Sequence, residues 1–197
     1  NYVLPSVAAM WVYTIYTMVD GIFVARGVGK EALAAVNISM PLINVAFALG
    51  ILFAVGASTK ASIYKGQNNG KKADRVFTLS TVTVACVGLI VAAVVMLNLT
   101  NVAKLLGATE ETMGYVKSYL GVIIMFVPFY MTSYNLEVLI KADGFPKKAI
   151  KTSLAGAATN IILDALFVLV FHWGITGAAV ATGLSQVLTF TVYLRHF

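Results

Sequence analysis

The chain has 197 residues, of which 59% are hydrophobic and only 11% charged, and its mean hydropathy is +0.87. Soluble domains contain roughly 45–50% apolar and about 25% charged residues, so the composition excludes a soluble globular protein and indicates an integral membrane protein. The net charge is +6, from 14 Lys and Arg against 8 Asp and Glu. The basic residues gather in short loops and form no face interleaved with aromatic residues, which argues against nucleic-acid binding.

Six apolar stretches reach about 20 residues, the length that a helix needs to cross a bilayer. In chain order, the predicted spans cover residues 1–25, 34–63, 76–99, 113–140, 149–171 and 178–194. The alternating pattern of membrane-barrel strands is missing from these stretches. We therefore predict an all-α integral membrane protein, a bundle of six transmembrane helices that occupies residues 1–197 as a single unit.

Small residues suggest how the second span packs. Ala46, Gly50 and Ala54 lie four residues apart, a spacing that lets helix backbones approach closely in lipid. The second span is accordingly predicted to be a packed interior helix. The lone cysteine, Cys86, lies in an apolar run and is interpreted as a small buried hydrophobe.

Charged residues near the span ends have simpler interpretations. Glu137 precedes Lys141 by four residues, the spacing of an ion pair within one helix. The two histidines, His172 and His196, lie at span ends and are interpreted as interface residues without ligand partners.

The loops predict the orientation of the chain. Ten of the 14 basic residues follow the second and fourth spans or lie near the C-terminal end, and four lie on the opposite side. By the positive-inside rule, both ends are expected in the cytoplasm, with the chain passing several times through the plasma membrane. Because the chain begins inside an apolar span without an initiator Met, we expect it to be truncated there.

Asp20 is the anomaly of the first span, because it lies among residues that otherwise belong in lipid. An ionisable group within a span costs a few kcal/mol, so such groups usually face a protein interior or a wet cavity and mark an ion or proton path. Asp164 in the fifth span is a second case. A purely structural role, in which both acids cap or bond neighbouring helices, is the alternative.

Four polar residues on four different spans lie at one predicted depth. Counted from the outer loops, Asp20 is six residues deep, Tyr119 is seven, and Asp164 and Thr182 are eight. At about 1.5 Å per residue, all four lie roughly 9–12 Å below the outer surface. We predict that their side chains face one pocket.

Two further polar residues extend this set by one helical turn. Tyr16 precedes Asp20 by four residues, and Asn160 precedes Asp164 by four, so each pair shares a helical stripe. Carboxylate, amide and hydroxyl oxygens suit a small hard cation, and a proton shared by the two acids suits them equally. Two ionised carboxylates in such a pocket repel each other, so one is expected to keep a proton until a cation or a base replaces it.

No arrangement for covalent or metal-dependent catalysis emerges from the sequence. The two histidines lie far from any nucleophile motif, and no paired-cysteine or His-x-x-x-His pattern is present. We therefore do not expect an enzyme, and we expect no cofactor apart from a coupling ion.

Several of these residues together resemble the multidrug and toxic compound extrusion (MATE) transporters. The resemblance is carried by Pro5, by residues 19–25 (VDGIFVA), 29–36 (GKEALAAV), 141–147 (KADGFPK) and 160–164 (NIILD), and by residues 174–182 (GITGAAVAT). These motifs occur in the family's order and cover most of the chain.

The resemblance implies one lobe of a twelve-helix antiporter that expels cationic or amphipathic compounds against inward flow of Na⁺ or H⁺. It implies a cation or proton site at Asp20, Tyr16, Asn160, Asp164 and Thr182, with Na⁺ possible at all but the tyrosine. Two further positions are implied: Tyr119 matches a substrate-pocket residue, and Pro5 matches a proline that bends the first helix. The C-terminal lobe is absent, so a second six-helix lobe is the expected partner, covalent or gained by dimerisation.

Two other functions remain open at the sequence level. A lipid-linked-sugar flippase lobe should line its cavity with basic residues, and no Arg or Lys lies in the middle of a span. A non-transporting membrane scaffold would tolerate the loss of both acids.

Overall fold

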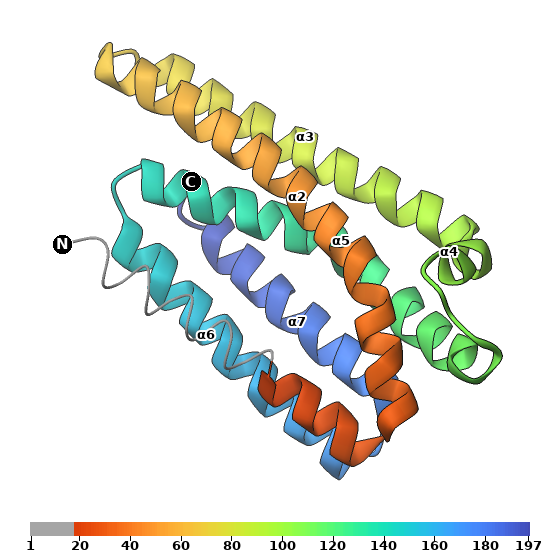
Figure 1. The fold of residues 1–197 in the computed structure, drawn as a ribbon. Helices are drawn as coiled ribbons and strands as arrows, with labels where there is room; N and C mark the ends of the chain where they lie inside the picture. The colour runs from red at the N-terminus through yellow and green to blue at the C-terminus, as the bar shows by residue number, and fades with distance from the viewer. Residues whose placement is uncertain (1–17) are drawn as a thin grey trace.

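The computed structural model describes residues 18–197, and every regular element within them is helical (Figure 1). Residues 18–27 form the end of the first helix. The elements that follow are α2 (Lys30–Gly66), α3 (Gly70–Leu97), α4 (Leu99–Leu105), α5 (Glu110–Ala142), α6 (Pro146–Asp164), a π-helical segment η1 (Ala165–Val170) and α7 (Gly174–Leu194). Five of these helices, with η1 continuing α6, are long and apolar enough to cross a membrane. The predicted all-α membrane bundle is confirmed.

The helices extend beyond most of the predicted spans because polar residues complete their first turns. Thr109 caps α5, where its side chain and that of Thr112 bond each other's backbone N–H, and Glu110 and Glu111 favour the positive end of the helix dipole. Residues 174–177 lie outside the predicted sixth span, but they belong to α7, which already begins at Gly174.

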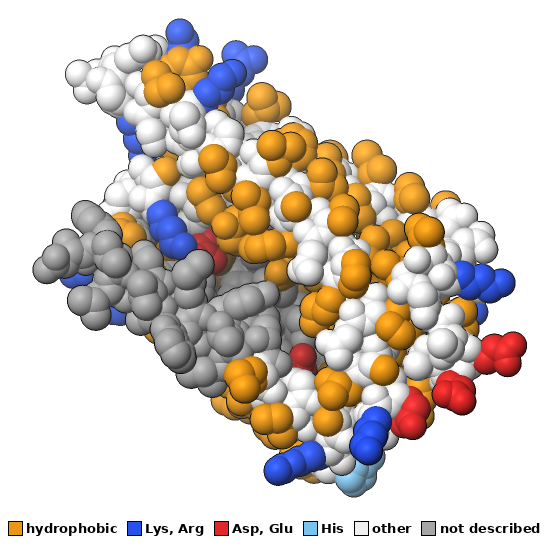
Figure 2. Space-filling model, viewed as in Figure 1, with side chains coloured by type: hydrophobic (Ala, Val, Ile, Leu, Met, Phe, Trp, Pro, Cys, Tyr) orange, Lys and Arg blue, Asp and Glu red, His pale blue; other side chains and the backbone are white. Residues whose placement is uncertain are grey.

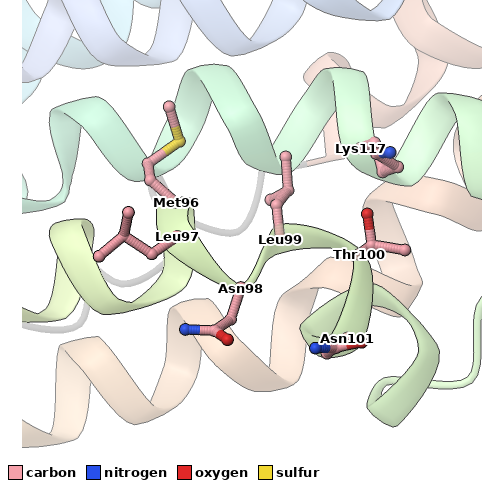
Figure 3. Close-up of a pocket in the computed structure, with 7 residues that line it drawn as sticks. All are labelled: Met96, Leu97, Asn98, Leu99, Thr100, Asn101 and Lys117. Carbon is pink, nitrogen blue, oxygen red and sulfur yellow. The ribbon is translucent and has the colours of Figure 1, made fainter.

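The link between the third and fourth spans contains the short helix α4. A break at Asn98 separates α3 from α4 and leaves a shallow pocket of about 290 Å³ against α5 (Figure 3). Lys117 of α5 reaches this pocket, beside Thr100 and Asn101 of α4.

The interior helix of the bundle is α5, which packs against α2, α3 and α7. A Cβ on Gly88 of α3 would lie 2.7 Å from the Cα of Pro128, so the two helices touch backbone to backbone there. The prediction that the second span is interior is therefore wrong for α2 as a whole. Its small residues Ala46, Gly50 and Ala54 are buried, but its other faces carry exposed apolar side chains such as Leu52.

Apolar side chains cover the outside of the bundle between two charged ends (Figure 2). Cys86 lies on this outer surface and is exposed, so its interpretation as a buried residue is wrong. Lipid and protein interior are equally apolar surroundings, so a small apolar side chain is stable in either.

One end of the bundle is held by a cluster of polar side chains around Asp143, in the turn between α5 and α6. Lys65 at the end of α2 donates to Oδ1 of Asp143, and Nε2 of His196 lies 3.0 Å from Oδ2. Burial by itself would raise the pKa of the Asp143 carboxyl, but the hydrogen bonds from Lys65 and His196 and the positive charge of Lys65 outweigh it and hold that pKa below its ordinary value. We call these three residues the Asp143 cluster.

The Asp143 cluster brings the loop after α2, the turn after α5 and the C-terminal residues to one end, as the distribution of basic residues predicts. His196, interpreted from the sequence as an interface residue, also accepts a hydrogen bond from Lys148 at 3.0 Å through Nδ1. The intrahelical pair of Glu137 and Lys141 is confirmed, with 2.5 Å between the charged atoms.

Candidate functional site

Two acids from separate helices meet inside the bundle. Asp20 lies in the helix of residues 18–27, and Asp164 is the last residue of α6 before the π-helical segment. Their carboxyl groups lie near enough to each other to interact electrostatically. Asp164 is fully buried and Asp20 is half-buried, so neither side chain is turned freely to lipid.

Four oxygen atoms at this place are buried without a hydrogen-bond donor among residues 18–197. They are Oδ1 of Asp20, Oδ1 of Asn160 and both carboxyl oxygens of Asp164. A buried polar atom left without a partner costs about 1–3 kcal/mol. An acceptor set of this kind fits a ligand that supplies positive charge or donors, namely a small hard cation or a proton.

Asn160 is oriented by its neighbour on α7. Its Nδ2 donates to Oγ1 of Thr182 at 3.3 Å, which fixes the amide so that its oxygen stays available as an acceptor. The buried stripe of α6 contains Gly156, Asn160 and Asp164, spaced by four residues, so Asn160 and Asp164 face the same interior.

The sequence of α6 also explains how α6 and α7 come close enough for this bond. Gly156 faces α7 so closely that an added Cβ would collide with the Cγ2 methyl of Thr189. Any larger residue at position 156 would separate the two helices one turn away from Asn160.

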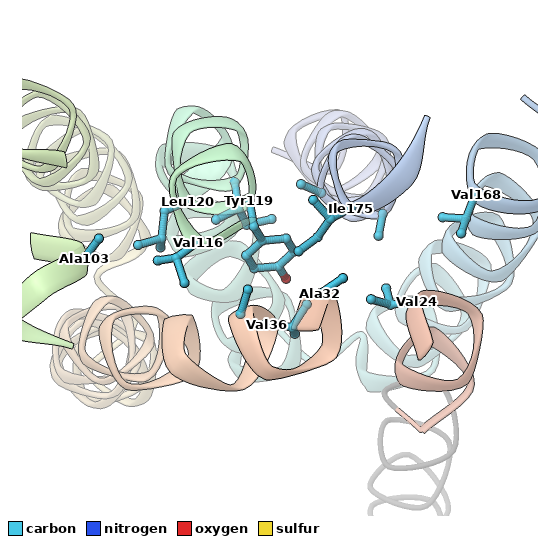
Figure 4. Packing of buried hydrophobic residues seen from close by; sticks show 13 residues of the cluster. Val24, Ala32, Val36, Ala103, Val116, Tyr119, Leu120, Val168 and Ile175 are labelled. Carbon is cyan, nitrogen blue, oxygen red and sulfur yellow. The ribbon is translucent and has the colours of Figure 1, made fainter. Parts of the chain in front are cut away.

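Tyr119 of α5 lies beside the two acids in the buried core of the bundle. Only 3% of this residue is exposed, and its ring packs among Val36, Ala32 and Ile175 (Figure 4). Both acids act electrostatically on its phenol group. The structure therefore brings Asp20, Asn160, Asp164, Thr182 and Tyr119 together, while their roles stay predictions.

The π-helical segment after Asp164 is a feature that the sequence analysis missed. Such segments are rare and often occur at functional sites, and here the segment lies against both neighbouring helices. A Cβ on Gly27 would meet Val168 of η1 at 2.5 Å, and a Cβ on Gly177 would meet Phe167 at 3.1 Å. Residues 165–170 contain neither Gly nor Pro that would signal a change from α-helix to π-helix. The only signal in the sequence is the pair of glycines, Gly27 and Gly177, that face this segment.

Two predicted site residues, Pro5 and Tyr16, lie outside the described residues 18–197. Within the described part, no group of three or more His, Cys, Asp and Glu side chains gathers as a metal cluster. Among residues 18–197, the oxygen atoms that could bind a cation at this place therefore come from two carboxylates, one amide and hydroxyl groups. Together they carry at most two negative charges.

Comparison with known proteins gives a consistent result. The MatE family model matches residues 5–166. The multidrug export protein MepA of Staphylococcus aureus (strain NCTC 8325) is 28% identical over all 197 residues, which span 44% of its length.

Solved structures agree with this match. A crystal structure of MATE in the bent conformation has a TM-score of 0.88 at 27% identity, over 96% of this chain and 42% of that one. A crystal structure of MATE in the straight conformation has a TM-score of 0.86 at the same identity and coverage. This chain thus spans less than half the length of these relatives. It belongs to the MatE family, whose members are membrane transporters and not enzymes.

Proposed function

We propose that this chain is the N-terminal lobe of a cation-coupled antiporter that exports cationic or amphipathic organic compounds. The site for the coupling ion, Na⁺ or H⁺, is formed by Asp20, Asp164, Asn160 and Thr182. The observation that supports this proposal is the set of four buried oxygen atoms without a donor among residues 18–197.

The two possible ions use this set differently. Na⁺ takes oxygen ligands, and carboxylates with an amide and a hydroxyl oxygen are suitable ones. A proton needs only the two facing carboxyl groups, which cannot both stay ionised at short distance in a dry pocket. Because Na⁺ and the proton compete for the same oxygens, binding of one releases the other.

Coupling to export requires that ion binding favour one of two conformations. The helix of residues 18–27 carries Asp20 and ends against the π-helical segment, where Gly27 faces Val168. A shift of this helix would separate Asp20 from Asp164 and change the shape of the pocket beside Tyr119. Relatives have been solved in a bent and in a straight conformation, which fits a first helix with two states. Pro5 is the proposed bending point and Tyr16 a further ligand.

The relatives support two further parts of the proposal, namely the class of exported compounds and the need for a second lobe. MepA is by name a multidrug export protein, and we propose the same class of substrate here. A second lobe of six helices, covalent or gained by dimerisation, would supply the surface against which alternating access works. We also propose that the protein lies in the plasma membrane with the end carrying the Asp143 cluster in the cytoplasm.

The coupling site is tested by Na⁺ binding to the purified chain in nanodiscs, measured with ²²Na⁺ and with a pH indicator. We expect Asp164→Asn and Asp20→Asn each to weaken Na⁺ binding by at least about tenfold, since each removes a buried charged ligand. Na⁺ should also release protons from the unaltered chain. Asp74→Asn, which removes an exposed acid at the start of α3, is the matched control and should change neither signal.

One outcome would decide against this proposal, and a second would identify the coupling ion. Unchanged ²²Na⁺ binding and proton release in both pocket variants would favour a scaffold that tolerates loss of the acids. Proton exchange that persists without any Na⁺ binding in the unaltered chain would assign the site to H⁺ alone. Export itself is measured as ethidium efflux from cells in which the chain is joined to a second lobe, and Asp20→Asn should abolish it.

A further inference from the structure

A second concave site lies far from the two acids, where the start of α6 faces the end of α7. This groove has a volume of about 850 Å³. One side is formed by residues 144–148, 150–152 and Ala155, which belong to α6 and the turn before it, and the other side by Leu188 and Val192 of α7. It lies at the same end of the bundle as the Asp143 cluster, because Lys148 in its wall bonds His196.

The groove is strongly basic. Lys147, Lys148 and Lys151 line it, and no Asp or Glu does. Two acids at this end are engaged elsewhere, Asp143 by the other members of its cluster and Glu137 by Lys141. Within the described part of the chain, the three lysines are therefore not neutralised by an acid.

The lysines of the groove divide into two kinds. Lys148 donates to the ring of His196 and is only half-exposed, whereas Lys147 and Lys151 are exposed. Lys147 and Lys151 are four positions apart in the sequence, so their ammonium groups extend from one face of α6. They can take up one phosphate group between them.

The groove also presents apolar side chains of α6 and α7, which we call its floor. Leu188 and Val192 are 39% and 36% exposed, one turn apart on α7, and Ile150 lies opposite on α6. A basic rim above an apolar floor, at the end of a transmembrane helix pair, matches a lipid with an anionic headgroup and acyl chains. Free phosphate would leave the floor unused, and an acidic peptide would have to enter the hydrocarbon region.

We propose that the groove between α6 and α7 binds an anionic phospholipid, with its phosphate at Lys147 and Lys151 and an acyl chain along Leu188 and Val192. The pocket between α3 and α4 offers a useful contrast. It is about a third of this volume and presents a single lysine, Lys117, so we do not expect it to hold such a lipid.

The inference is tested by native mass spectrometry of the full chain released from detergent, titrated with phosphatidylglycerol or phosphatidylcholine. We expect the unaltered chain to bind one molecule of phosphatidylglycerol. The double variant Lys147→Gln/Lys151→Gln should bind this lipid about tenfold more weakly, since each lysine near an anionic lipid contributes to its attraction. The double variant Lys147→Arg/Lys151→Arg should retain binding. Leu188→Ser should weaken binding without altering the charge.

The matched control is Lys60→Gln/Lys71→Gln, which removes two exposed positive charges at the same end but outside the groove. Equal weakening in this control would overturn the proposal, because it would show diffuse attraction to the basic end. Equal binding of phosphatidylcholine, or displacement of the lipid by millimolar inorganic phosphate, would overturn it too. Since Asp20 and Asp164 lie outside the groove, Asp164→Asn should bind the lipid normally, which separates this inference from the proposed coupling site.

Discussion

The contact between Gly156 and Thr189 offers a way to perturb the candidate site without changing any residue in it. In Gly156→Ala, the new Cβ would collide with the Cγ2 methyl of Thr189. This methyl cannot rotate away freely, because the Thr189 hydroxyl bonds the backbone oxygens of Ser185 and Gln186 at 3.2 and 3.0 Å. The helices α6 and α7 must therefore move apart, and the 3.3 Å bond from Asn160 to Thr182 lengthens.

Overpacking a tight contact by one methyl group costs roughly 1–3 kcal/mol. Alanine in place of glycine within a helix stabilises by about 0.5–1 kcal/mol, so the two ranges leave a net cost of about 0–2.5 kcal/mol. Because the collision with Thr189 is close, we expect a net destabilisation of about 1–2 kcal/mol for Gly156→Ala. For a chain of this length, each kcal/mol corresponds to roughly 2–4 °C in Tm. The variant should thus melt about 2–8 °C below the unaltered chain and bind ²²Na⁺ more weakly.

The assay is thermal unfolding in detergent micelles, followed by circular dichroism. Gly56→Ala on α2 is the control, because a Cβ there meets nothing within 4 Å and should not lower Tm. Thr189→Ser, which removes the methyl but keeps the hydroxyl, should restore most of the loss when combined with Gly156→Ala. If Gly156→Ala melts no lower than the control, or if Thr189→Ser gives no recovery, the close approach of α6 and α7 does not orient Asn160.

Two further predictions concern packing and charge. Leu120→Ala should lower stability by about 2–3 kcal/mol, because Leu120 is fully buried and its truncation leaves a cavity. Leu89→Ala should cost little, because Leu89 of α3 is 60% exposed and lipid fills the space. Equal losses of Tm in the two variants would contradict this prediction. Asp143→Asn should cost about 1 kcal/mol at pH 7 by breaking the contacts with Lys65 and His196. The folded pKa of Asp143 is depressed, so its stabilisation is complete above the ordinary value of about 3.9 and disappears as the pH falls through the folded pKa. A Tm difference between Asp143→Asn and the unaltered chain that persists below that pH would refute the assignment.

The sequence by itself determined the class of the protein and predicts its spans and the depth of its acids. Helix length is set by bilayer thickness, and the rise per residue is constant. Counting from the loops therefore puts Asp20, Asp164, Tyr119 and Thr182 at one level, and the structure brings their side chains together. Residues this polar inside an apolar span are conspicuous in any sequence.

Only the tertiary structure decided which helix faces are interior. In the structure α5, and not α2, is the central helix, and Cys86 is exposed on the outer surface. His196 contacts Asp143, and a π-helical segment follows directly after Asp164. The physical reason is that lipid and protein core are both apolar, so hydrophobicity does not distinguish a residue that faces one from a residue that faces the other. That distinction depends on close contacts between distant segments, such as Gly88 on Pro128, which no local pattern records.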